Sequence, residues 1–231
     1  MKTIYILHGW TTAPERWDNF IRCLAESGFE TRLLRIPGLT EKTDHVWTLD
    51  DYVNWLKEIL DEESEKPILL GHSNGGRIAL AYAAKYPQTL RLLVLIDSAG
   101  IYHNQLPIRL KRYMFRTIAK LGKKFTTSEM LRSLLYKMAQ ERDYRAASPV
   151  LRETMQKLIS VDLTPRLGDI NTSTVIIWGS GDTITPLSDG KLMRRCIPNA
   201  KLVIIEGAGH SPQYTHSAQV CRSIAAETAT I

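Results

Sequence analysis

Short apolar runs alternate with stretches of helical periodicity along most of the chain. Residues 2–7 form a nearly unbroken apolar run that ends at a His-Gly-Trp turn, which is typical of a buried strand. Residues 15–27 follow with Trp17 and Leu24 on one helical face, and Gly28 stands where helices commonly end. The same alternation predicts strands over residues 31–36, 68–70, 90–96, 174–178 and 201–205, and helices over residues 49–60, 76–86, 188–196 and 217–228.

Alternation of this kind favours right-handed crossovers around a parallel sheet that is covered by helices on both faces. The chain begins directly at its first predicted strand. We therefore expect an α/β fold with a mostly parallel sheet of about six strands.

The alternation of strands and helices stops between residues 101 and 166. Helical spacing recurs there over residues 110–121, 130–138 and 150–159, without any strand pattern. The last of these helices has a clear start, with Ser148 as N-cap and Pro149 at the first helical position. Because the segment leaves the sheet after Asp97, at the edge where ligands bind in such folds, it can act as a helical lid. We predict a core of residues 1–100 and 167–231 and a lid of residues 101–166. Simple packing of its Met-containing faces on the sheet is the alternative.

Charge separates the predicted lid from the core. The chain carries a net charge of +6, and residues 101–166 hold 14 Lys and Arg against 5 Asp and Glu. Such a basic segment could attract an acidic carrier protein, an anionic substrate or a membrane surface, or it could simply be solvated. We expect a small-molecule ligand and no nucleic-acid partner.

Composition predicts one ordinary globular domain, with 44% hydrophobic and 23% charged residues in 231. The first apolar run is too short for a signal peptide or a membrane span, so we expect a cytoplasmic protein without a transmembrane segment. Cys23, Cys196 and Cys221 lack metal-binding spacing, and we expect buried free thiols without a disulfide or a metal.

Residues 68–76, ILLGHSNGG, place Ser73 between a predicted strand and a predicted helix. A serine at the apex of such a turn needs small neighbours, which Gly71 and Gly75 supply. The following helix start can stabilise a negative oxygen. The pattern indicates a nucleophile, although a Gly-rich turn without chemistry has the same sequence.

A serine nucleophile needs a base and a group that orients the base. Asp182 and His210 follow two later strands on Gly-rich turns, and the order Ser73, Asp182, His210 is that of one known hydrolase arrangement. Asp97, after the fourth strand, is a rival for the position of the acid. No cofactor is needed for this chemistry.

Backbone N–H groups of Trp10 and Asn74 are the expected donors to a negative carbonyl oxygen. His8 and His72 stand beside these turns in the sequence, and we expect both to support the loops rather than to transfer protons.

The segments LHGW, GHSNGG, WGSGDTITP and GAGHSP resemble the α/β-hydrolase superfamily over nearly the whole chain outside the predicted lid. HGWTTAPERW and GHSNGG are similar to small intracellular carboxylesterases, including pimeloyl-carrier-protein methyl esterases. The resemblance implies a lidded serine hydrolase of esters or thioesters without metal or cofactor. Its catalytic triad would be Ser73, Asp182 and His210.

Other members of the superfamily remain as alternatives. Ser73 argues against haloalkane dehalogenases and epoxide hydrolases, which resemble this chain but have aspartate there. Carbon-carbon bond hydrolases of ring-cleavage products share the triad, typically with a glycine-richer first turn. A non-catalytic ligand-binding protein of the same fold is the alternative outside the enzymes.

Overall fold

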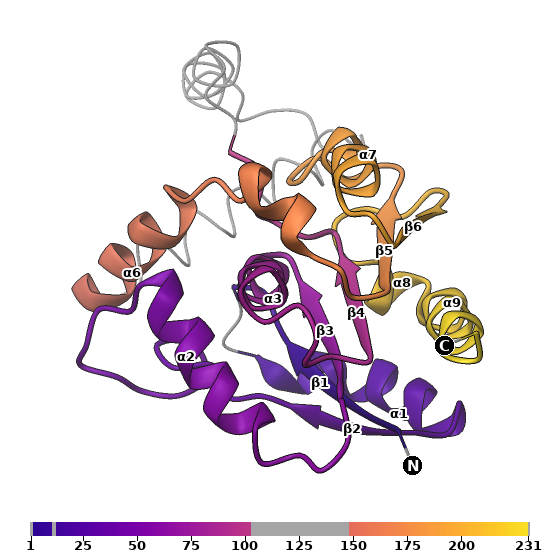
Figure 1. The fold of residues 1–231 in the computed structure, drawn as a ribbon, viewed down its shortest axis with the longest axis horizontal. Helices are drawn as coiled ribbons and strands as arrows, with labels where there is room; N and C mark the ends of the chain where they lie inside the picture. Colours follow the sequence, from indigo (N-terminus) through magenta and orange to yellow (C-terminus); the bar gives the residue numbers. More distant parts are fainter. Residues whose placement is uncertain (1, 11–12, 103–147, 231) are drawn as a thin grey trace, which may run out of the picture.

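Six parallel strands form the centre of the protein in the computed structural model, which describes residues 2–10, 13–102 and 148–230 (Figure 1). The sheet order is β2-β1-β3-β4-β5-β6, and every neighbouring pair is parallel. The expected fold class and strand number are thus confirmed. The strands are β1 (Lys2–Leu7), β2 (Phe29–Leu33), β3 (Ile68–His72), β4 (Leu92–Ile96), β5 (Thr174–Gly179) and β6 (Ala200–Ile205).

Helices cover both faces of this sheet. One face packs under α1 and α9, and the other under α2, α3 and α7, so two separate apolar layers are buried. None of the helices in the described ranges is long and apolar enough to cross a membrane. The helical segments are η1 (Pro14–Trp17), α1 (Asp18–Glu26), α2 (Leu49–Leu60), α3 (Asn74–Lys85), α6 (Pro149–Ile159), η2 (Thr164–Asp169), α7 (Leu187–Cys196), α8 (Pro212–Thr215) and α9 (Ser217–Thr228).

Several predicted boundaries differ from the structure by two or three residues, and two of them have a clear cause. The second strand ends at Leu33 instead of residue 36, because β2 pairs only with β1 and its last partner there is Ile6. The helix expected from residue 76 starts at Asn74, because Ser73 makes the whole turn between β3 and α3 by itself.

The third helix of the predicted lid is confirmed as α6. Ser148 Oγ accepts the backbone N–H of Leu151 at 3.1 Å, and Pro149 occupies the first turn. The buried Thr154 hydroxyl accepts the N–H of Trp47 at 3.0 Å, which ties α6 to the segment before α2. The other two expected helices, over residues 110–121 and 130–138, lie outside the described residues. The limits of the lid stay a prediction.

The three cysteines are free, as expected, but only Cys221 is fully buried. Cys23 and Cys196 are partly exposed, which corrects the expectation for those two residues. Burial raises the pKa of the Cys221 thiol, and a hydrogen bond with Cys23 adds to the shift. α1 and α9 therefore bring together two thiols that are distant in the sequence.

Candidate active site

The strand order reverses at β1, which has β2 on one side and β3 on the other. Crossovers leave β1 and β3 in opposite directions, so the loops at their carboxyl ends diverge and leave a crevice. The turn at His8 to Trp10 follows β1, and Ser73 follows β3. The fold therefore brings these two predicted features to the position where open α/β sheets bind ligands.

Ser73 is held in a strained conformation, with φ 54° and ψ −118°. An L-residue rarely adopts a positive φ, and such strain is retained where the surroundings enforce it. The surroundings here are very close, since a Cβ atom on Gly71 would lie 2.6 Å from the Gly75 carbonyl oxygen. A Cβ atom on Gly75 would overlap the carbonyl oxygen of Leu7. Both glycines are thus required for α3 to start against β1 and β3.

Ser73, His210 and Asp182 form a continuous hydrogen-bonded chain. His210 Nε2 lies 2.9 Å from Ser73 Oγ, and His210 Nδ1 lies 2.7 Å from Asp182 Oδ2. The Asp182 side chain is fully buried, whereas that of His210 is 12% exposed. Both ring nitrogens of His210 are therefore engaged, one by a fully buried carboxyl group and the other by Ser73.

Thr185 is a member of this network that the sequence did not indicate. Its hydroxyl donates to Asp182 Oδ2 at 2.7 Å and lies 3.1 Å from the backbone oxygen of Asp97. The N–H groups of Ile184 and Thr185 point at Asp182 Oδ1, at 2.7 and 3.1 Å. The turn after β5 thus surrounds one carboxylate with donors, which stabilises its negative charge.

Asp97, the rival acid, lies in the same place but in a different environment. It is fully buried with φ 42°, and its Oδ1 accepts the N–H of Gly179 at 2.9 Å. One carboxylate oxygen of Asp97, one of Asp182 and a ring nitrogen of His210 all lie within 4.8 Å of one another. Among the described residues, the His210 ring is hydrogen-bonded to Asp182 and not to the carboxyl group of Asp97. Of the two acids, Asp182 is therefore the one in direct contact with the His210 ring.

His8 and His72 support the loops, as expected. His8 Nε2 lies 2.9 Å from Thr40 Oγ1 and its Nδ1 lies 2.8 Å from the oxygen of Gly9, which fixes the turn after β1. His72 Nε2 lies 2.8 Å from the backbone oxygen of His210. Burial lowers the pKa of His72 to about 3 and also lowers that of His8, so both rings stay neutral at pH 7.

The two expected backbone donors belong to the residue that follows Ser73 and to the turn after β1. Asn74 is the first residue of α3, so its N–H has no acceptor within the helix. Gly9 precedes Trp10, and a Cβ atom there would lie 3.0 Å from Ser73 Cβ, so the turn after β1 passes directly over the serine. The Asn74 amide and the turn after β1 therefore both adjoin Ser73.

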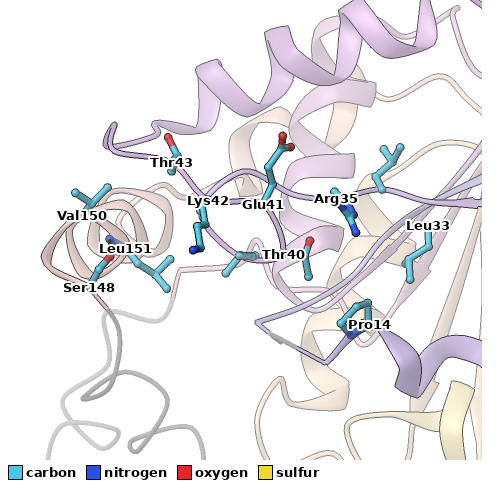
Figure 2. A pocket seen from close by; sticks show the side chains of 13 residues that line it. Pro14, Leu33, Arg35, Thr40, Glu41, Lys42, Thr43, Ser148, Val150 and Leu151 are labelled. Carbon is cyan, nitrogen blue, oxygen red and sulfur yellow. Dashed lines mark hydrogen bonds between the residues drawn. The ribbon is translucent and has the colours of Figure 1, made fainter.

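A groove of about 650 Å³ opens between Pro14, the segment after β2 and the start of α6 (Figure 2). Its lining includes the apolar Leu39 and Leu151 and the basic Arg35 and Lys42. The side chains of Lys42 and Glu41 extend in opposite directions in Figure 2. Thr40, which also lines the groove, is the partner of His8, so the groove adjoins the turn after β1.

Comparisons with known proteins agree with this architecture. The profile of a family described as "alpha/beta hydrolase fold" matches residues 2–217. A 2-hydroxy-6-oxononadienedioate/2-hydroxy-6-oxononatrienedioate hydrolase of Klebsiella pneumoniae is 30% identical over 94% of this chain and 83% of its own. Hydrolase 1 of the same name from Pseudomonas putida is 27% identical over 94% and 84%.

Among solved structures, a meta-cleavage product hydrolase from Pseudomonas fluorescens superposes with a TM-score of 0.71. It is 20% identical, and the match covers 98% of this chain and 90% of the other. At that identity the likeness concerns the fold alone. The profile match, the six-stranded sheet and the identity to the Klebsiella relative together show that this protein belongs to the alpha/beta hydrolase family.

Proposed function

We propose that this hydrolase uses Ser73 as a nucleophile on a carbonyl carbon, with His210 as base and Asp182 as the group that orients and stabilises the base. The continuous chain of 2.9 and 2.7 Å contacts is the observation that carries the proposal. As the bond from Ser73 Oγ to the carbonyl carbon forms, the hydroxyl proton passes to His210 Nε2. The carbonyl electron pair moves to oxygen, where the N–H groups of Asn74 and Trp10 would stabilise it.

Collapse of this intermediate breaks the bond to the leaving group, which takes the proton from His210. Water then attacks the acyl-enzyme with His210 again as base, and releases a carboxylic acid and free Ser73. The same groups can cleave an ester, where the leaving atom is oxygen, or a carbon-carbon bond, where the leaving carbon is protonated. The triad alone therefore does not select the bond.

Of the two candidate reactions, we favour cleavage of a carbon-carbon bond in a ring-cleavage product. The relatives that cover 94% of the chain are named as hydrolases of 2-hydroxy-6-oxo dienoic acids. A carboxylic ester or thioester is the second candidate, and it is favoured by the similarity of HGWTTAPERW and GHSNGG to small carboxylesterases.

A charged end of the substrate is consistent with both candidates. The relatives' substrates are named as dioates, which carry two carboxylates. The groove next to Thr40 offers Arg35 and Lys42 against the single acidic residue Glu41, beside apolar side chains, and this excess of positive charge suits a chain with an anionic end. An acidic carrier protein bound to the basic segment 101–166 stays a prediction, because most of that segment lies outside the described residues.

Covalent labelling tests the nucleophile. A fluorophosphonate should label the wild-type protein on Ser73, and Ser73→Ala should lose labelling and on the order of 10⁴-fold or more of turnover. Ser160→Ala, which changes an exposed serine at the end of α6, is the matched control and should behave as wild type. Folded protein that is not labelled would instead support the non-catalytic binder.

A comparison of substrates tests which bond the enzyme cleaves. Purified enzyme is assayed with a 2-hydroxy-6-oxo dienoate and with short carboxylic esters, and kcat/KM is compared. A higher kcat/KM for the dienoate supports carbon-carbon cleavage. Turnover of esters alone, lost in Ser73→Ala, would replace that assignment with an esterase while leaving the nucleophile intact.

A further inference from the structure

Two carboxyl groups face His210, and the proposed mechanism uses only one of them. Asp97 follows β4 and Asp182 follows β5, and these strands are neighbours in the sheet. Their carboxylate oxygens and a ring nitrogen of His210 lie within 4.8 Å of one another. Oδ1 of Asp97 accepts the N–H of Gly179, whereas its Oδ2 is buried and has no hydrogen-bond partner among the described residues.

Two carboxylates at this separation and depth cannot both be charged at low cost. Asp182 accepts two backbone N–H groups, the Thr185 hydroxyl and the His210 ring, so its negative charge is stabilised. Asp97 has one backbone donor. Burial, followed by the charge of Asp182, raises the pKa of Asp97 to about 9. Of the two carboxyl groups, Asp97 is therefore the one whose environment favours the protonated form.

We propose that Asp97 is the second acid of His210, a positioning residue that takes over the negative charge when Asp182 is removed. The inference rests on the proposed function, in which His210 becomes positively charged during the reaction. Loss of Asp182 removes the part of the increase in the Asp97 pKa that comes from charge repulsion, and a positive charge on His210 favours the ionised form of Asp97 further, against the effect of burial. A carboxylate within 4.8 Å of the ring would then stabilise the imidazolium through space, without a direct hydrogen bond.

The position of Asp97 also supports this role. Its φ of 42° is a conformation that costs free energy for a residue with a side chain, and it directs a carboxyl group into the interior where an apolar residue would avoid the cost of burial. The titratable groups that face this carboxyl are Asp182 from the turn after β5 and His210 from the turn after β6, with His72 of β3 behind His210.

A double-variant comparison tests the inference. The rate of fluorophosphonate labelling at Ser73 and kcat/KM are measured from pH 6 to 10 for Asp182→Ala and for the double variant with Asp97→Asn. We expect Asp182→Ala to retain at least about tenfold higher rates than the double variant, because one charge close to a buried ring is worth that much or more. We also expect this advantage to grow as pH rises and Asp97 ionises.

Two controls accompany the comparison. Asp182→Ala combined with Asp169→Asn, a change in a surface ion pair of η2, should match Asp182→Ala. If Asp182→Ala does not fold, Asp182→Asn with and without Asp97→Asn provides the same comparison.

Equal rates and equal pH profiles of the single and double variants would overturn the role of Asp97. In that case, labelling of the wild type that is lost in Ser73→Ala would still support the proposed function. A folded wild type that is never labelled would refute both the nucleophile and the role of Asp97.

Discussion

Replacing Gly75 by alanine tests how the close approach of α3 to β1 positions the nucleophile. An alanine Cβ would overlap the oxygen of Leu7 and lie 2.6 Å from that of His8, whereas ordinary contact begins at 3.4 Å. The start of α3 must therefore move by more than ~1 Å away from the turn after β1 to relieve the overlap with the Leu7 oxygen, because packed interiors leave no free space. Ser73 and the amide of Asn74 lie on the segment that moves.

We expect Gly75→Ala to lower the activity much more than the stability. Displacing a catalytic group by ~1 Å can lower the rate on the order of 100-fold. Over-packing costs ~1–3 kcal/mol, of which ~1 kcal/mol is offset because alanine is a better helix former than glycine. We expect kcat/KM and the rate of labelling at Ser73 to fall about 100-fold, while the free energy of unfolding falls by at most about 2 kcal/mol.

Fluorophosphonate labelling and thermal unfolding measure the two effects on the same samples. Gly168→Ala is the control, because a Cβ atom there meets no other atom within 4 Å, and it should label as wild type. A Gly75→Ala protein that is labelled at the wild-type rate would show that this contact does not set the position of Ser73.

Two further predictions concern the groups around His210. Thr185→Val removes a donor to Asp182, and because hydrogen bonds to charged groups contribute ~1.5–3 kcal/mol, kcat/KM should fall about tenfold or more while Thr185→Ser stays near wild type; full activity of the valine variant would contradict this role. Burial lowers the pKa of His72 from its usual 6.5 to about 3, so the unfolded chain binds this proton more readily, and stability should fall as pH drops from 6.5 toward 3. His72→Gln should remove up to ~1.4 kcal/mol per pH unit of that slope in urea unfolding, whereas His45→Gln, at an exposed ring, should keep it; an unchanged slope in His72→Gln would refute the assignment.

Hydrophobic periodicity predicted the layers of the fold but not the ends of each strand. It reports which residues are buried, and Ile36 is buried although β2 ends at Leu33. The limit of β2 depends instead on hydrogen bonding to β1, which is an edge-strand effect set by register. The turn at Ser73 was predicted from its glycine neighbours, but its length was not, because the local pattern does not show that β3 continues to His72 and that α3 already starts at Asn74.

The candidate site was likewise predicted where a local sequence pattern marks a residue, and not where its position depends on contacts between distant segments. Ser73, Asp182 and His210 were candidates because each follows a strand, and parallel strands bring their carboxyl ends to one edge. Thr185 was not a candidate, because a threonine in a turn has no distinctive pattern. Its place near Asp182, His210 and the backbone of Asp97 arises only when the turn after β5 folds back toward β4.

The charge around His210 depends on which of the buried side chains near it are neutral. Burial lowers the pKa of His8 and His72 and raises that of Asp97 to about 9, so at pH 7 none of these three carries a charge. Asp182 accepts hydrogen bonds from two backbone N–H groups and lies in contact with the His210 ring. In the proposed mechanism, a proton taken up by His210 therefore meets this carboxyl group and no second imidazolium among the described residues. A charged His72 ring, 5.2 Å from the ring of His210, would oppose that protonation, so the burial that keeps His72 neutral favours the proposed role of His210.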